Sequence, residues 1–172
     1  GLKAIYFANF DDLNTDNIGY DGTNGDVIDT WQPATALDLF KYELKSNENS
    51  FTTAIQTSRD NGTTFFEQTL QISLKKQDQA MHKNIKLLAY GRPRIIVRTM
   101  TDQFFLMGLA QGCDTTAGEI SSGAALGDFN GYKLTFVASE VLPANFIDVS
   151  TEAALITAFA TSGGDNAVIK TN

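Results

Sequence analysis

The residue types that usually carry catalysis are few in this chain. His82 is the single histidine and Cys113 the single cysteine. Nucleophilic catalysis needs a general base beside the nucleophile, and the G-x-S-x-G pattern that places a serine on a sharp turn does not occur. His82 stands in a predicted helix next to Lys83, which favours a structural or exposed role. We therefore predict that the chain is not an enzyme and needs no cofactor.

The N-terminal region contains the best candidate for a metal site. Asp12, Asn14 and Asp16 match the first three ligand positions of a calcium-binding loop. Asn17 then replaces the required glycine, and Thr23 stands where the bidentate glutamate belongs. A solvated acidic loop is therefore favoured over a metal site. With one cysteine, neither an intrachain disulfide nor a thiolate cluster can form, and synthesis in the cytoplasm fits best.

The charge of the chain is acidic and unevenly distributed. The net charge is −7, from 13 basic and 20 acidic residues, which argues against a protein dedicated to binding phosphate backbones. Acidic residues gather in residues 1–30 and basic residues in residues 75–98. Patches of opposite sign could steer head-to-tail self-association, although both could simply be solvated. The predicted inter-subunit charge patches are Asp11, Asp12, Asp16, Lys83, Lys86, Arg94 and Arg98. A phosphate-binding patch of Arg92, Arg94 and Arg98 is a weaker alternative.

The clearest structural pattern is a long amphipathic β-hairpin, Phe51–Ser58 paired with Thr63–Leu74. In the second strand, apolar Phe66, Leu70, Ile72 and Leu74 alternate with polar residues, a period of two. The polar face consists of Glu67, Thr69, Gln71 and Ser73. Asn61-Gly62 accepts positive φ, so this sequon-like segment is interpreted as the turn. A strand of about 12 residues extends roughly 40 Å, so it bends between two sheets or projects from its domain.

The remaining patterns predict a mainly β (α+β) fold, a β-sandwich or barrel with one flanking helix. The helix is Gln77–Tyr90, where apolar residues recur at helical spacing before Gly91 and Pro93. Further strands are predicted at 2–8, 40–44, 94–100, 103–111, 132–139 and 168–169. Ser150 could cap a short helix, Thr151–Phe159.

We expect one structural domain over residues 1–172. It comprises a flexible acidic loop or arm (9–36), a β core (38–148) with helix 77–90, and a C-terminal helix and tail (149–172). Residues 112–128 are predicted to form a second loop. No stretch approaches the roughly 18 apolar residues that span a bilayer.

From Phe40 to Ile147 the order of elements resembles the major tail proteins that form the inner tube of tailed bacteriophages. The resemblance consists of the long hairpin, the helix, paired strands and a Gly/Ser/Thr-rich loop. It ends on Asp128-Phe129-Asn130-Gly131-Tyr132-Lys133-Leu134-Thr135-Phe136, followed by Glu140 and Pro143-Ala144-Asn145. The N-terminal arm and the C-terminal tail depart from the pattern.

The resemblance implies a virion structural protein that assembles with itself into stacked rings, usually hexameric, and contacts other tail or neck proteins. Viral DNA would pass through the bore without sequence-specific binding. The protein would be made in the host bacterial cytoplasm and end in the virion tail, without a membrane. Glu67, Thr69, Gln71 and Ser73 would face the lumen, and Asn61 and Gly62 would belong to the assembly hairpin.

Two other functions stay open from the sequence. A phage neck or head–tail connector protein with the same fold would also form a ring. A ligand- or carbohydrate-binding β-barrel module would use exposed Tyr20, Trp31 and Tyr42 as a sugar platform.

Overall fold

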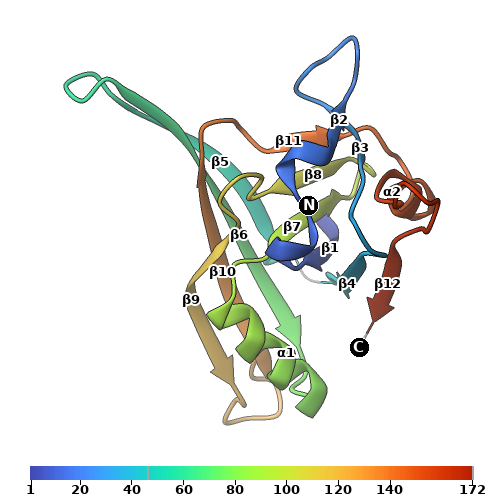
Figure 1. Ribbon diagram of the computed structural model, residues 1–172. Helices are drawn as coiled ribbons and strands as arrows, with labels where there is room; N and C mark the ends of the chain where they lie inside the picture. Colours follow the sequence, from blue (N-terminus) through green and yellow to red (C-terminus); the bar gives the residue numbers. More distant parts are fainter. Residues whose placement is uncertain (46, 172) are drawn as a thin grey trace.

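A computed structural model describes residues 1–45 and 47–171 of the chain. Its described residues form two β-sheets and two α-helices, as Figure 1 shows. The mainly β, α+β fold predicted from the sequence is therefore confirmed, with a sandwich of sheets and a flanking helix.

The larger sheet has eight strands in the order β12-β4-β1-β7-β8-β11-β3-β2. Their bounds are β1 Leu2–Ala8, β2 Ile18–Tyr20, β3 Ile28–Trp31, β4 Asp38–Glu43, β7 Arg94–Thr99, β8 Phe104–Met107, β11 Asn145–Ile147 and β12 Val168–Thr171. β1 and β7 pair antiparallel at its centre, and both are buried on both faces. This explains their nearly continuous apolar sequences, because a strand covered on both sides has no solvent face to keep polar.

The smaller sheet contains the predicted hairpin. Its four strands are antiparallel in the order β5-β6-β10-β9, with β5 Ser50–Ser58, β6 Thr63–Lys75, β10 Gly131–Glu140 and β9 Asp114–Ser121. Gly62 in the turn has φ +63°, the left-handed conformation that favours glycine. Hairpin and turn are confirmed.

One apolar core lies between the two sheets. Helix α1 (Gln79–Tyr90) closes this core with Ile85, against Leu70, Ile72 and Phe136 of the smaller sheet. The second core lies on the opposite face of the larger sheet, under helix α2 (Glu152–Ala158). The larger sheet is thus the middle layer, with the smaller sheet and α1 on one side and α2 on the other.

The N-terminal region departs from the predicted loop or arm. It forms two 3₁₀ turns, η1 (Phe10–Asp12) and η2 (Thr15–Asn17), and then strands β2 and β3. Leu13, Ile28 and Trp31 are buried in the second core. These few buried apolar residues pack a mostly polar segment against the larger sheet. The composition of the segment alone therefore does not predict its structure.

Three further details differ from the sequence-based expectation. The predicted second loop contains β9, whose Asp, Thr, Gly and Glu residues suit an exposed edge strand rather than a core strand. Helix α1 begins two residues later than predicted, after Asp78. Thr151, rather than Ser150, caps α2 by accepting a hydrogen bond from Ala154 N. Within the described residues, no helix is long and apolar enough to span a membrane.

Candidate assembly site

The hairpin β5–β6 extends beyond the body of the molecule, and its tip contacts no other element in Figure 1. Ile55 is 67% exposed and Phe65 38% exposed near this tip. Ile55 pairs with Phe66 on the face that continues from the core, whereas Phe65 lies on the opposite face beside Gln56. The tip therefore carries large apolar side chains on both faces, and the described part of the chain leaves them exposed.

β5 is also an edge strand of the smaller sheet, so no strand among the described residues pairs with the other side of its backbone. Its sequence Ser-Phe-Thr-Thr-Ala-Ile-Gln-Thr-Ser contains no charge, proline or glycine. Soluble proteins usually protect a sheet edge with charges, prolines, bulges or a covering element. The opposite edge strand, β9, has Asp114, Glu119 and Gly118, and its pairing with β10 shifts register between Thr135 and Phe136. An edge as long and uncharged as β5 is suited to pairing with another chain.

The outer face of the smaller sheet is polar, as the hairpin pattern predicted. Thr69 and Gln71 on β6 pair with Val137 and Thr135 on β10. Of the predicted lumen and hairpin residues, Gln71, Asn61 and Gly62 are exposed and Glu67 and Thr69 are half-buried. Ser73 departs from the prediction because it is buried: its backbone N–H donates to Asn49 Oδ1 at 2.7 Å, so the segment before β5 covers this end of β6.

An apolar groove of about 410 Å³ lies at the root of the hairpin. Its wall is a ladder of three aromatic rings that crosses from β5 to β8 and β11. The ring centroids of Phe51 and Phe105 are 6.0 Å apart, and those of Phe105 and Phe146 are 4.3 Å apart. Phe146 is 46% exposed, and Asp26 stands on the rim. The three rings are far apart in the sequence, so no local sequence pattern predicts that they meet. The sequence signal for this site is limited to Phe146, which directly follows Pro143-Ala144-Asn145.

The predicted charge patches divide into two groups. Asp11, Asp12, Asp16, Lys83 and Lys86 are exposed. Arg98 is half-buried and pairs with Asp102, at 2.6 Å between Nη2 and Oδ1. Arg94 is 2% exposed, so it cannot form a surface patch with Arg92 and Arg98. The prediction for Arg94 is corrected because its side chain is directed into the body.

Arg94 binds three backbone carbonyls that belong to two segments of the chain. Its Nε donates to Leu109 O at 3.0 Å, and its Nη1 donates to Phe10 O and Leu13 O, each at 2.7 Å. Its guanidinium also lies over the ring of Phe10, 4.1 Å from the centroid. Burial lowers the pKa of Arg94 to about 10, which leaves it charged at neutral pH. Arg94 therefore ties the N-terminal region to the turn that follows β8.

Glu140 at the end of β10 fixes the same turn from the other side. Its Oε1 accepts hydrogen bonds from Ala110 N and Gln111 N, at 3.1 and 2.8 Å. Burial raises the pKa of this carboxyl, while the two N–H donors and the charge of Arg94 act in the opposite direction. The glutamate that follows the Asn-Gly-Tyr strand is thus a structural residue.

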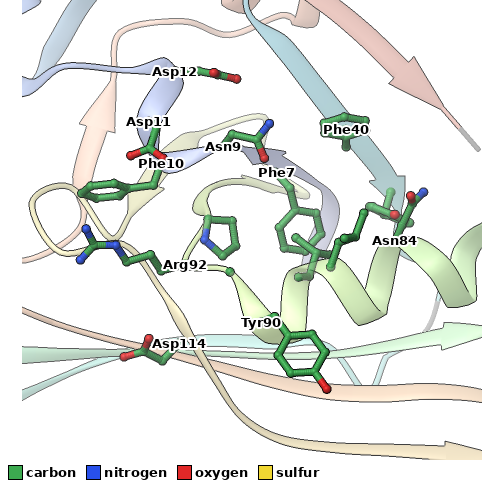
Figure 2. Close-up of a pocket in the computed structure, with 15 residues that line it drawn as sticks. Phe7, Asn9, Phe10, Asp11, Asp12, Phe40, Asn84, Tyr90, Arg92 and Asp114 are labelled. Atoms are coloured by element: carbon green, nitrogen blue, oxygen red, sulfur yellow. The ribbon is translucent and has the colours of Figure 1, made fainter.

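A cleft of about 780 Å³ lies between the N-terminal region and α1 (Figure 2). Figure 2 shows Phe7 and Phe40 on its inner side and Asp11, Asp12 and Arg92 near its rim. Its described lining contains no serine, threonine, cysteine, lysine or histidine, and His82 lies on α1 with its ring 6.2 Å from that of Tyr132. The described lining of this cleft therefore holds no serine, threonine or cysteine nucleophile paired with a histidine base.

The calcium candidate is organised as a turn. The side chain of Asn14 accepts a hydrogen bond from Asp16 N and so caps η2. Among the residues that the structure describes, no three His, Cys, Asp or Glu side chains are grouped to hold a metal ion.

The predicted sugar platform does not form. Trp31 is buried and donates from Nε1 to Asn14 O at 2.8 Å. Tyr42 is buried in the core between the sheets, where its ring meets that of Phe7 edge-on. Only Tyr20 of the three aromatic residues is exposed, so this arrangement removes the observation that favoured a carbohydrate-binding module.

Comparisons of the chain with protein-family models, with curated proteins and with solved structures find no match.

Proposed function

We propose that this chain is a virion structural protein of the tail-tube type, which assembles with itself into stacked rings around a DNA conduit. The observation that carries the proposal is the uncharged edge strand β5 on a hairpin that projects from the body. In a monomer this edge favours uncontrolled pairing, whereas in a closed ring it is covered by the next copy. The resemblance of the segment from Phe40 to Ile147 to the major tail proteins supports the same class of protein.

Ring closure would join β5 of one copy to the smaller sheet of its neighbour. The outer face of that sheet would then line the bore. On this face Glu67 and Glu119 are acidic and Lys75 and Lys133 are basic, among threonine, serine and glutamine residues. A wall on which these acidic and basic residues balance would bind phosphate weakly, so DNA could slide along it. A phage neck or connector ring would use the same closure without extended stacking.

Electron microscopy of the purified protein tests the proposal directly. We expect rings or tubes in negative stain, with ring averages that give the copy number, for which six is expected. Tubes would favour the tail tube, and single rings the neck or connector. A strict monomer at high protein concentration would contradict both.

A charge on the β5 edge tests the mechanism of closure. Ala54 is exposed on β5, and Ala54→Lys places a cation on the edge without removing a core contact. We expect this variant to keep the circular dichroism spectrum of the wild type and to lose its rings. The matched control is Ala34→Lys, which adds the same charge at an exposed position outside the strands. Rings that persist in Ala54→Lys would show that β5 is not the joint.

A further inference from the structure

Helix α1 carries a second stripe of residues that the core does not use. Its core stripe is Met81, Ile85 and Leu88. On another face Lys83, Lys86, Leu87 and Tyr90 follow one another at the spacing i, i+3, i+4, i+7, and all four are exposed. Leu87 is 62% exposed and Tyr90 is 86% exposed, and both line the cleft described above. Figure 2 shows Tyr90 at this cleft. A stripe of large apolar and basic side chains is typical of a helix that docks into a groove.

The groove at the hairpin root has the complementary composition. It offers the aromatic ladder Phe51, Phe105 and Phe146, and its rim contains Asp26. Three residues after Asp26, β3 carries the exposed Asp29. An apolar floor beside these two carboxylates is suited to a helix that presents leucine, tyrosine and lysine.

The two surfaces lie at opposite ends of the molecule. In Figure 1, α1 is at the lower end, whereas β11 and the β2–β3 segment are at the upper end. The stripe therefore cannot reach the groove of its own chain. When two complementary surfaces of one chain face away from each other, copies join head to tail and the contact repeats without closing.

We propose that α1 of one copy docks into the groove at the hairpin root of a second copy, and that this contact stacks successive rings. Leu87 and Tyr90 pack on the aromatic ladder, and Lys83 and Lys86 face Asp26 and Asp29. The proposal rests on the proposed function, which concerns closure within a ring through β5. The occupant of the groove is a second copy of this chain because the chain itself supplies both the apolar and the charge complement.

Charge reversal on each surface tests this contact. One variant carries Lys83→Glu and Lys86→Glu, so that its helix and its groove are both acidic. The other carries Asp26→Lys and Asp29→Lys, so that both are basic. We expect each variant alone to form rings and to need at least about a tenfold higher protein concentration to stack, because like charges then meet. An equimolar mixture should restore stacks, since each helix then meets a groove of opposite sign.

The apolar half of the contact has its own matched pair of variants. Phe146→Ser should weaken stacking, while Leu126→Ser, at an exposed position in the loop after β9, should leave it unchanged. Circular dichroism checks that every variant folds. Normal stacking by both charge variants would overturn the inference and leave ring closure intact. Failure of the equimolar mixture to stack would have the same meaning. If the wild type forms no rings, the proposed function and this contact fall together.

Discussion

Replacement of Arg94 by methionine should destabilise the fold strongly, although the sequence places this arginine in a charged surface patch. The side chain donates three hydrogen bonds to backbone carbonyls of Phe10, Leu13 and Leu109, from a position that is 2% exposed. Methionine keeps much of the volume but leaves these carbonyls without their donor and leaves the buried Glu140 without a nearby cation. Removing one partner of such a buried charged network costs about 3–5 kcal/mol.

Urea denaturation of the wild type and the variant measures this loss as a change in the free energy of unfolding. For a domain of this size the same change lowers the melting temperature by about 6–20 °C. Arg98→Met is the matched control, because Arg98 lies on the same strand and face but is half-buried and pairs with Asp102. Its loss should stay near 1 kcal/mol or less, the usual range for a partly solvated ion pair.

Two results would refute the reasoning about Arg94. Equal losses for the two variants would show that burial does not separate their roles. Normal stability combined with defective assembly would return Arg94 to an interface. Arg94→Lys refines the test, because lysine keeps the charge but cannot reproduce the fork that reaches two segments at once. We expect its stability to lie between those of the wild type and the methionine variant.

Three further outcomes follow from single contacts. Burial raises the folded-state pKa of Glu140, so the protonated carboxyl contributes its full stability below pH about 4, and this contribution is lost as the pH rises through the folded-state pKa. As the pH rises through that pKa, Glu140→Gln should therefore gain stability relative to the wild type, which denaturation at several pH values measures. Gly131→Ala should cost about 1–3 kcal/mol or more in thermal unfolding, because a Cβ there would collide with the backbone of β6, while Gly127→Ala, in open space, should be close to neutral. Tyr6→Phe should cost about 1–2 kcal/mol in urea denaturation, because the hydroxyl donates to Glu152 at 2.7 Å and so joins β1 to α2.

The hairpin and helix α1 were predictable because their patterns are local. The alternation of apolar and polar residues along β6 predicts a strand and the face that it buries. The Asn61-Gly62 turn sets the connection to β5 and with it the register of the hairpin. The apolar spacing of α1 and Gly91 likewise determine where that helix ends. In these segments burial on one face and local backbone preference require the same structure, so the sequence was sufficient.

The N-terminal region was not predictable from its composition because its structure depends on distant contacts. Trp31 donates to Asn14 O, and Arg94 binds the carbonyls of Phe10 and Leu13, residues about 80 positions away. A single buried guanidinium satisfies backbone groups that a polar loop would otherwise give to water. These contacts bury Arg94 and Trp31, although their residue types predict a surface charge and an exposed aromatic residue.

Strand β9 was missed for a different reason. Its residues Asp114, Gly118 and Glu119 suit a loop, and it becomes a strand because β10 supplies a partner along its length. The aromatic ladder at the hairpin root shows the same limit for a binding surface. Phe51, Phe105 and Phe146 come from three strands, and only the packing of one sheet against the other brings their rings together.

The two ways in which this chain could meet its copies can be separated because they use different chemistry. Pairing along β5 would depend on backbone hydrogen bonds of an uncharged strand, so it should change little with salt. Docking of α1 would depend in part on Lys83 and Lys86 facing carboxylates, so it should weaken as ionic strength rises from 0.05 to about 0.5 M. Rings that persist at high salt while stacks dissociate, measured by sedimentation velocity, would agree with both proposals. Parallel loss of rings and stacks would contradict the division between them, because a single contact would then hold the whole assembly.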